Sequence, residues 1–467
     1  MNQEDLQHAE GFRDRISTVT GGGKRKWIYA LKPSGFFFKW RNVSLIIYLL
    51  VFFGIPFIKY NNEPFVLINV VKGKFIIFGK IFFPQDFFIF AVGMIALIIF
   101  IALFTIIYGR LFCGWACPQT VFMELIFRRI EWWIEGSPNQ QKALKERAWD
   151  GEKMLRKLAK HLIFLLISFL IAHTFLAYIL GIDEVIKIIQ DPVEAHWSLF
   201  IGLMVFTALF YGVFAYVREI VCTTICPYGR LQSVLFDKST MQIAYDYSRG
   251  EPRGKIAKGT ERKLGDCIDC MKCVHVCPTG IDIRDGVQME CVGCTACIDA
   301  CDEVMGKIGF PKKLIRYASE DEIANKIPFH FTGRMKAYSF VLVFLIALMT
   351  FLVLKGNSID TYVKRAQGQL YQEMENNTIG NLYVAKILNK TNRERTIEIR
   401  LENRPGEIRF IGDKDKSLKP EIVNEREFFV ILDKNSLSQR KTPIELGVYE
   451  NNKRIQLVKT NFLGLYK

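Results

Sequence analysis

The stretch "FFIFAVGMIALIIFIALFTIIYGRLFCGWACPQT", residues 87 to 120, joins an uncharged apolar run to a pair of cysteines. The run from Phe87 to Tyr108 is long enough to cross a bilayer, which takes about 20 apolar residues. The Cys-x-x-x-Cys-Pro motif that follows, residues 113 to 118, recurs at residues 222 to 227 after another apolar run. The repetition predicts two related membrane helices, each leading into a pair of thiols.

Four further apolar runs meet the same length requirement, so the sequence predicts a membrane α-helical protein. The five predicted spans are Val43 to Ile58, Phe87 to Tyr108, Leu162 to Ile182, Trp197 to Val217 and Ala337 to Leu354. The first is short and contains Pro56, but Lys59 could extend its charged end out of the bilayer.

The basic residues are concentrated in alternate connections between these spans. Residues 109 to 161 contain ten Lys or Arg, whereas residues 183 to 196 contain one Lys and four acidic residues. This asymmetry predicts a cytoplasmic N-terminus and a C-terminus on the outer side of the membrane. The net charge of +15 lies in these connections, and no basic patch with interleaved aromatic residues stands apart from them. Nucleic acid is therefore excluded as a partner, and the lipid bilayer is expected.

All twelve cysteines fall in the two connections predicted to be cytoplasmic, residues 109 to 161 and 218 to 336. The predicted external tail has none. Because the cytoplasm is reducing, clustered cysteines there indicate metal or redox chemistry instead of disulfides.

The densest cysteine motif is "CIDCMKCVHVCPTG" (267 to 280) followed by "CVGCTACIDACDE" (291 to 303). Each half has the C-x2-C-x2-C-x3-C spacing of bacterial two-cluster ferredoxins, in which the fourth cysteine of one half binds the cluster of the other. The predicted ligands are Cys267, Cys270, Cys273 and Cys301 for one [4Fe-4S] cluster, and Cys277, Cys291, Cys294 and Cys297 for the second. Zinc sites are the alternative, although zinc ribbons pair two C-x2-C units. Two adjacent clusters predict a carrier of single electrons.

The two membrane-side pairs each end in a proline. Pro118 and Pro227 are predicted at first helical positions, which would make Cys117 and Cys226 helix caps. The helix dipole, with Arg110 and Arg218 nearby in the sequence, is expected to favour thiolates.

Three interpretations of these pairs stay open. They could handle copper, because soft thiolates select Cu(I). They could hold a third cluster or serve a quinone-linked relay, or they could be inert buried cysteines. The residues concerned are Cys113, Cys117, Cys222 and Cys226.

Histidine offers little support for a haem. Only His173 lies deep within a predicted span, and a bis-histidine haem needs two. His173 is expected to be hydrogen-bonded within the helix packing, and His275 to be a surface residue.

Three other segments have readable patterns. Residues 60 to 86 contain two apolar runs split by Lys-Gly-Lys, which predicts an external hairpin. Residues 119 to 135 are amphipathic and are expected to lie along the inner interface, with Trp132 and Trp133 in the aromatic belt. From about residue 372 onward, six alternating segments predict a small β-sandwich.

The segments "CGWACPQT", "CPYGRLQSVLFD", "YSRGEPRGK", "GDCIDCMKCVHVCPTGIDIRDGVQMECVGCTACIDACDEVM" and "LIRYAS" closely resemble the cytochrome c oxidase accessory protein family of the CcoG, FixG or RdxA type. The resemblance is dense from about residue 109 to 317. It implies a bacterial inner-membrane polyferredoxin with a periplasmic immunoglobulin-like tail, acting in assembly of cbb-type oxidases. It also implies a cupric reductase activity, in which copper is associated with the two membrane-side cysteine pairs.

The resemblance and the patterns together predict five domains: 1–42, a cytoplasmic basic segment; 43–230, a four-span membrane domain; 231–335, a cytoplasmic two-cluster ferredoxin insert; 336–355, the fifth span; and 356–467, a periplasmic immunoglobulin-like domain. Expected partners are an unidentified cytoplasmic electron donor, copper-transport or chaperone proteins and oxidase assembly proteins. Two other functions stay open: a quinol-linked electron-transfer subunit without a copper role, and a non-enzymatic assembly or docking factor.

Overall fold

The computed structural model describes residues 25–60, 63–70, 73–255, 264–355, 359–366, 370–374, 377–391, 393–412, 417–420, 422–437 and 439–464. The predicted basic N-terminal segment lies outside the described residues as far as residue 24. The described chain divides into two compact units, residues 1–58 with 90–348 and residues 59–89 with 349–467.

In the part of the chain that the structure describes, five helices are long and apolar enough to cross a membrane, which confirms the predicted spans. They are α2 (Phe36–Gly54, extended to Phe57 by η1, Ile55–Phe57), α3 (Phe87–Tyr108), α8 (Gly151–Leu180), α10 (Trp197–Gly212, extended to Val217 by η5, Val213–Val217) and α16 (Gly333–Lys355). The first span begins seven residues earlier than the sequence predicted, at Phe36 instead of Val43. The helix therefore enters the segment expected to be a soluble basic start.

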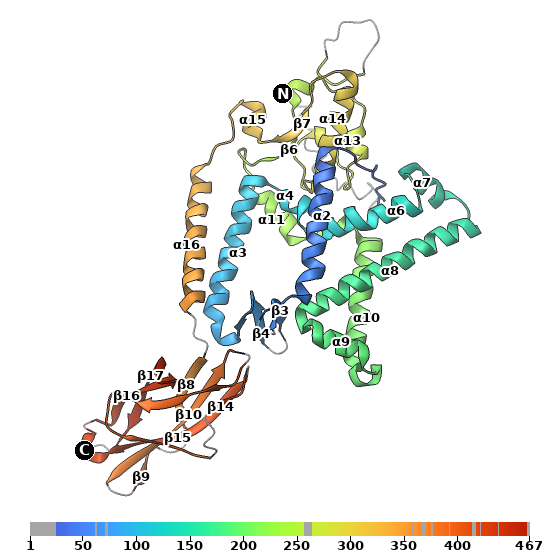
Figure 1. Cartoon of the computed structure of the whole chain (residues 1–467). Helices are drawn as coiled ribbons and strands as arrows, with labels where there is room; N and C mark the ends of the chain where they lie inside the picture. Colours follow the sequence, from blue (N-terminus) through green and yellow to red (C-terminus); the bar gives the residue numbers. More distant parts are fainter. Residues whose placement is uncertain are drawn as a thin grey trace. The chain divides into compact units, whose positions relative to one another are not determined.

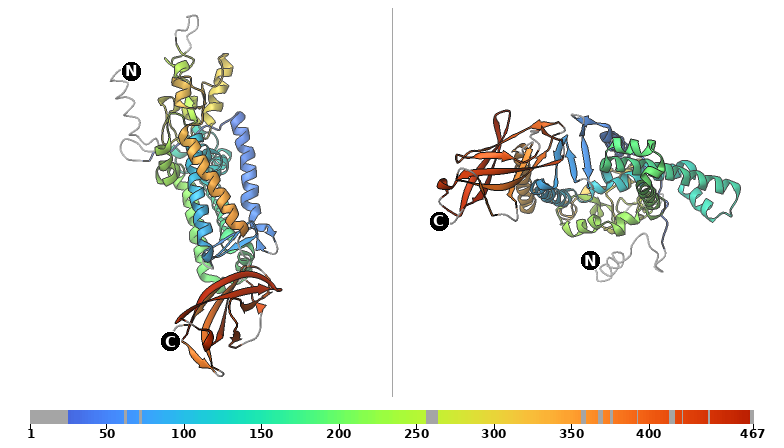
Figure 2. Two further views of the ribbon diagram at one scale, coloured as in Figure 1. Left: turned by 90° about the vertical axis from the view of Figure 1, so that its left-hand side faces the viewer. Right: turned by 90° about the horizontal axis from the view of Figure 1, so that it is seen from below.

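The helices pack in groups and leave apolar surface facing outward. Helices α3 and α16 lie side by side (Figures 1 and 2) and share a core that includes Leu103, Ile106 and Met335. Elsewhere Phe127 and Phe214 stack at a centroid distance of 4.4 Å. Large apolar side chains such as Leu50 and Phe340 are exposed along the outer faces. Contiguous apolar exposure of this kind is normal in contact with lipid.

Short helices follow the two cysteine motifs. After α3 come α4 (Leu111–Trp115), α5 (Pro118–Phe122), the π-turn η3 (Met123–Phe127), α6 (Arg128–Ile134) and α7 (Pro138–Glu146). After α10 come the π-turn η6 (Val221–Ile225) and α11 (Pro227–Leu235). Cys117 and Cys226 are the N-cap residues of α5 and α11, with proline at the first helical position in both, so the predicted caps are confirmed.

The ferredoxin insert is built from loops around a few short elements. Strands β6 (Gln242–Tyr245) and β7 (Ile315–Ala318) pair antiparallel and frame α12 (Tyr247–Gly250), α13 (Lys272–His275), η7 (Ile283–Asp285) and α14 (Ala296–Ile308). Helix α15 (Glu320–Ala324) follows β7. Buried cysteines contribute to the core, where Ile243, Ile298 and Leu314 also pack.

The segment after the first span folds as strands, as predicted, but it forms a two-stranded pair and a three-stranded sheet instead of one hairpin. It contains the pair β1 (Lys59–Tyr60) and β2 (Glu63–Pro64) and the antiparallel sheet β3 (Val66–Asn69), β4 (Lys74–Ile77) and β5 (Lys80–Phe82), before η2 (Pro84–Asp86). Between α8 and α10 lie α9 (Ile182–Gln190) and η4 (Val193–His196).

The C-terminal region is a β-sandwich, as predicted. One sheet has the order β13 (Glu407–Phe410), β15 (Val423–Asp433), β10 (Thr378–Asn389) and β8 (Ile359–Arg365), with β9 (Gln372–Met374) paired to β10. A second sheet has the order β12 (Glu398–Leu401), β16 (Lys441–Glu450) and β17 (Lys453–Leu463). Strand β11 (Arg395–Thr396) pairs with β14 (Ser417–Leu418), and η8 (Lys434–Ser436) follows β15. Strand β8 precedes the predicted start of the domain's strands, and its alternation was missed.

The sandwich core should depend strongly on Phe428. Its ring is fully buried and stacks on Tyr383 at 5.9 Å. We expect Phe428→Ala to destabilise the sandwich by about 3–5 kcal/mol, because removing a buried aromatic ring leaves a cavity. Pulse proteolysis of the purified full chain in urea measures this as a lower midpoint for cleavage after residue 359. Tyr362→Ala, which removes a ring 57% exposed on β8, is the control, and equal losses in both variants would contradict the packing.

Candidate metal centre

Four cysteines of the ferredoxin insert line a first cavity. They are Cys267, Cys270, Cys273 and Cys301, from the loop before α13, from α13 and from α14. Met271, Met305 and Leu314 contribute apolar lining. The cavity therefore brings together the three close cysteines of the first half-motif and the last cysteine of the second half-motif.

A second cavity adjoins the first. It is lined by Cys277, Cys291, Cys294 and Cys297, together with Val292 and Ile281. Cys273 lines both cavities, so the two sites are neighbours. The crossed grouping of cysteines expected from the ferredoxin spacing is thus the grouping that the chain adopts.

The backbone repeats between the two half-motifs. Asp269 and Gly293, each just before the second cysteine of its half, have φ of 52° and 68°. Met271 and Thr295, each just after that cysteine, have φ of 57° and 63° and precede α13 and α14. Left-handed backbone conformations on both sides of a cysteine bend the chain, so that it curves around one central position. Of these four positions, only Gly293 has no side chain to be strained in this conformation.

The geometry fits cubes better than single ions. Among the residues that the structure describes, no three His, Cys, Asp or Glu side chains converge closely enough to hold one metal ion. Each cavity instead has four thiols around a void, as a cube with external ligands requires. Burial raises the pKa of Cys273 and of Cys301 to about 12, so binding of iron would displace protons.

The membrane-side cysteines lie against the second cavity. Cys113 and Cys222 pack into the same apolar cluster as Cys294 and Cys297. The Cys113 thiol is 3.3 Å from Gln232 Oε1, and Cys222 Sγ is 3.8 Å from Thr120 Oγ1. Gln232 and Thr120 were not predicted as site residues, because they meet these thiols only through the packing of α5 and α11.

The expectation that the helix caps favour thiolates is wrong at Cys117, because burial raises the pKa of its thiol. Burial raises the pKa of Cys113 to about 12, and Arg110 opposes it only in part. Burial likewise raises the pKa of Cys222 to about 12. All four membrane-side thiols act electrostatically on one another, which places Cys117 and Cys226 in the same group. Without a bound cation, Cys113 and Cys222 are thiols at neutral pH.

Arg218 also differs from its expected role, because it belongs to a buried ion network. It donates to both carboxylate oxygens of Glu131, at 2.7 and 2.8 Å. Burial works to raise the pKa of Glu131, but Arg218 and Lys160 hold it below its ordinary value. Glu219 accepts from Arg25 at 3.2 Å. The network satisfies charges where the interfacial helices meet, and Glu131 was overlooked because the sequence shows only an amphipathic segment.

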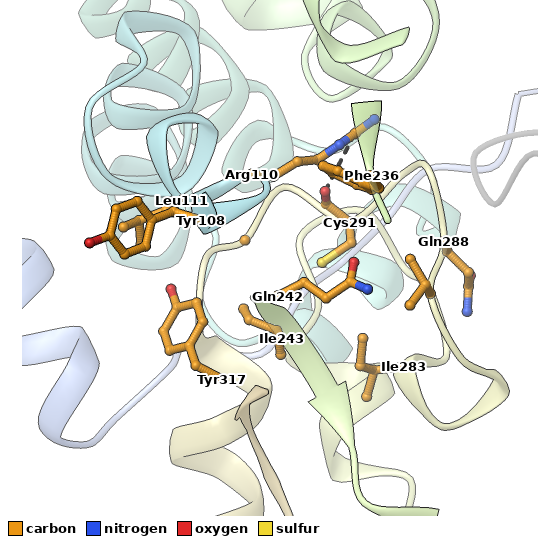
Figure 3. Close-up of a pocket in the computed structure, with 12 residues that line it drawn as sticks. Tyr108, Arg110, Leu111, Phe236, Gln242, Ile243, Ile283, Gln288, Cys291 and Tyr317 are labelled. Carbon is orange, nitrogen blue, oxygen red and sulfur yellow. Dashed lines mark hydrogen bonds between the residues drawn. The ribbon is translucent and has the colours of Figure 1, made fainter. Parts of the chain in front are cut away.

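A close contact between two backbones fixes the insert on the membrane helices. A Cβ at Gly114 would lie 2.4 Å from the carbonyl oxygen of Gly293, and one at Gly293 would lie 2.6 Å from that of Arg110. Arg110 donates to the carbonyls of Met289, Cys291 and Gly229. Figure 3 shows Arg110 joined to Cys291 at the pocket between the end of α3 and this loop.

The first span is tied to the same insert. Asp299 of α14 accepts from the backbone N–H groups of Phe37 and Phe38, at 3.1 and 2.8 Å, and so caps α2. Gly35, with φ of 143°, allows this approach because any side chain there would overlap Asp299. The cap explains why the helix begins at Phe36, since a carboxylate stabilises free N–H groups at a helix start.

The histidines and tryptophans take structural positions. His173 Nδ1 lies 2.9 Å from the Phe169 carbonyl oxygen within α8, as expected for a packed helix histidine. His275 lies on α13, where its carbonyl accepts from Leu31 N–H. Trp132 donates to the Ala30 carbonyl at 3.3 Å, so it anchors the chain before α2 in addition to any belt role, whereas Trp133 is exposed.

Comparison with known proteins agrees with this architecture. Protein RdxA of Cereibacter sphaeroides is 34% identical over 379 residues, which cover 78% of this chain and 79% of RdxA. The chain belongs to the FixG/RdxA family. Nitrogen fixation protein FixG of Rhizobium meliloti is 29% identical over 475 residues, covering 91% of this chain and 90% of FixG.

Three family models match parts of the chain. A "4Fe-4S dicluster domain" matches residues 217–320, a "4Fe-4S binding domain" matches residues 90–136, and an "IG-like fold at C-terminal of FixG" matches residues 349–465. A crystal structure of a FixG-related protein from Vibrio parahaemolyticus is 19% identical and covers 23% of this chain and 98% of its own, with a TM-score of 0.20 too low to support a conclusion. The protein is a membrane iron-sulfur electron-transfer protein of the FixG/RdxA family, with two [4Fe-4S] clusters.

The contact at Gly114 can be tested by adding one methyl group. Gly114→Ala would force the loop at Gly293 away, because backbone atoms 2.4 Å from a Cβ must move. We expect faster amide hydrogen exchange in residues 286–297 of the purified full chain, measured by mass spectrometry. Gly212→Ala, with open space around its Cβ, is the matched control. Unchanged exchange in Gly114→Ala would show that the loop does not dock here.

Proposed function

We propose that the protein takes single electrons from a cytoplasmic donor and reduces Cu(II) to Cu(I) at or near the membrane-side thiols, in support of cbb-type cytochrome c oxidase assembly. The observation that carries the proposal is the packing of Cys113 and Cys222 into the apolar cluster that also contains Cys294 and Cys297. Two of the four cysteines outside the ferredoxin motif thus lie in one cluster with two cysteines of the second cavity. Soft thiolates select Cu(I) among the ions a cell offers.

The eight cysteines of the insert are assigned as cluster ligands on the grouping in the two cavities. One cluster is given to Cys267, Cys270, Cys273 and Cys301, and the other to Cys277, Cys291, Cys294 and Cys297. When bound, the clusters supply one-electron carriers, which suits a reaction that adds one electron to Cu(II). The exposed Cys270 offers a surface where a donor can approach.

The four membrane-side thiols would handle copper as a substrate. Because Cys113 and Cys222 keep their protons when no cation is present, binding of copper would release protons. Gln232 and Thr120 would orient the two sulfurs by their contacts. The product Cu(I) is held by sulfur ligands more favourably than Cu(II), so these thiols favour the reduced product.

A third cluster is the second candidate for the same thiols. The "4Fe-4S binding domain" model matches residues 90–136, which contain Cys113 and Cys117. Four thiols near one another could hold a cube as well as copper. Such a cluster would suit a quinone-linked relay without a copper role.

Substitution of the two sets of cysteines separates these functions. Cys270→Ser should lower iron content and destabilise the insert, since metal binding is coupled to folding. Cys113→Ser and Cys226→Ser should keep all the iron, about eight atoms per chain from two cubes, but reduce Cu(II) more slowly. Iron analysis, visible spectra and stopped-flow reoxidation by Cu(II) of anaerobically purified protein measure this.

Each other outcome points elsewhere. Loss of roughly a third of the iron in Cys113→Ser and Cys226→Ser would assign a third cluster to them. Reoxidation by a quinone but not by Cu(II) would favour the quinol-linked function. Full iron with full copper reduction in both variants would make the membrane-side cysteines packing residues, and would leave a docking role.

We also propose that the N-terminus and the ferredoxin insert are cytoplasmic and that the immunoglobulin-like domain is periplasmic, in a bacterial inner membrane. The support is the concentration of basic residues in the connection 109–161 against the acidic connection 183–196. The five spans give the two ends opposite sides.

A reporter fused after Lys467 tests this orientation. Alkaline phosphatase there should be active and a fluorescent protein that folds only in the cytoplasm should be dark, because Lys355 would leave the fifth span on the outer side. The same pair of reporters after Glu146 should give the opposite pattern. Cytoplasmic activity at Lys467 would contradict the model.

A further inference from the structure

Two buried arginines lie beside the second cavity without an acidic partner. Arg41 and Arg110 are only 3% and 6% exposed. Among the described residues, neither forms an ion pair, and their hydrogen bonds go to backbone carbonyls: Arg41 to Gly114, and Arg110 to Met289, Cys291 and Gly229. Arg41 Nη2 and Arg110 Nε are buried without a hydrogen-bond acceptor. Glu124, an acid that interacts electrostatically with Arg41, is already paired with Arg128 at 3.3 Å.

Such an arrangement is unfavourable unless an anion is close. An unpaired buried charge costs several kcal/mol, and proteins normally neutralise it with a partner. Arg110 contacts the segment that carries Cys291, and Arg41 donates to the carbonyl of Gly114, where a Cβ would lie 2.9 Å from Cys294 N. Arg110 reaches the carbonyl of Cys291 at 3.4 Å (Figure 3), and Arg41 acts electrostatically on Cys294. Four thiolates around a bound cluster would supply the missing negative charge.

We propose that Arg41 and Arg110 are the counter-charges of the cluster held by Cys277, Cys291, Cys294 and Cys297, and that they raise its reduction potential above that of the other cluster. The inference rests on the assignment of ligands proposed above. Reduction adds one negative charge, and net charge and burial are among the factors that set the potential of such clusters. Two cations in a low-dielectric site favour that added charge strongly.

The first cavity differs in having carboxylates that act on two of its cysteines, whereas Glu290 acts on Cys291 of the second. Asp302 acts on Cys301, and both Arg284 and Asp282 act on Cys273, Arg284 the more strongly. Arg284 is the nearby cation, but it is shared between Asp282 and Asp269, at 2.6 Å from each. One cation against the carboxylates of Asp269, Asp282 and Asp302 leaves a net negative charge, which disfavours an added electron.

Burial alone would give the reverse order of potentials. The second cavity is the more enclosed, and desolvation disfavours added charge there, whereas Cys270 of the first is exposed to water. The arginines must therefore outweigh the desolvation for the proposal to hold. If they do, an added electron resides beside Cys294 and Cys297, the cysteines packed against Cys113 and Cys222.

Redox titration of the purified full chain, followed by electron paramagnetic resonance, tests the proposal. In Arg41→Gln and in Arg110→Gln, the higher-potential step should fall by at least the equivalent of a tenfold loss in the equilibrium constant, about 59 mV for one electron. The lower step should stay where it is. Arg41→Lys and Arg110→Lys, which keep the charge, should retain most of the potential.

Two matched variants complete the design. Asp302→Asn should raise the lower step and leave the higher step, because it removes a negative charge beside Cys301. Lys307→Gln, on α14 with its side chain 68% exposed, should move neither step, because water screens the charge.

Iron content distinguishes the possible failures. Unchanged potentials, or equal shifts of both steps, in Gln variants with full iron would overturn the proposal. Loss of about half the iron in the Gln variants and its recovery in the Lys variants would support it, since charge then decides whether the second cluster is held. Equal iron loss in the Gln and Lys variants would overturn it in favour of packing. Fewer than two clusters in the unsubstituted protein would instead overturn the ligand assignment.

Discussion

The close approach of two backbones, at Gly114 and Gly293, is the constraint on which the rest of the redox region depends. Each glycine lies where any side chain would overlap a carbonyl oxygen of the other segment. Because neither segment can move away without breaking the hydrogen bonds of Arg110 to Met289 and Cys291, the loop of the second cavity is held on the start of the first cysteine motif. Asp299 accepts hydrogen bonds from the first backbone N–H groups of α2 and so holds the start of this helix on the insert. A soluble ferredoxin module has thereby become a fixed part of a membrane domain.

The contacts that hold the insert on the membrane helices bury charged side chains. These buried charges are accommodated in two different ways. Around Arg218 the charges are mutually satisfied, since Glu131 accepts from both of its terminal nitrogens and Lys160 adds a second cation. Removing one member would leave the others unpaired at large cost, so the network holds the interfacial helices in one arrangement. Around the second cavity the cations Arg41 and Arg110 have no such partner among the described residues. The charges around Arg218 are balanced by side chains of the network itself. The charges of Arg41 and Arg110 are balanced only when an anion is present in the second cavity.

The features that could be read from the sequence are those specified locally. Five spans, the strands of the sandwich and the helix caps at Cys117 and Cys226 follow from apolar length, alternation and proline position. The grouping of the eight cysteines into two sets of four was predicted from the C-x2-C-x2-C-x3-C spacing of the two half-motifs. What could not be read depends on partners distant in the sequence. Helix α2 begins at Phe36 because of Asp299, more than 260 residues away, and the thiol of Cys113 keeps its proton because tertiary packing buries it. Arg218 seemed a neighbour of Cys222 in sequence, but its left-handed backbone, with φ of 57°, directs it to Glu131.

The two cysteine motifs are related in sequence but differ in what each cysteine does. In both, the second cysteine caps the following helix, and the first packs into the apolar cluster that also contains Cys294 and Cys297. The first motif reaches that position on the α-helical turn α4, where Gly114 permits contact with the insert. The second reaches it on a π-turn that contains Thr223 and Thr224, whose hydroxyl groups lie 3.4 Å apart. The motifs are thus equivalent at their sulfurs and different in their backbones, because only the first also has to dock the insert.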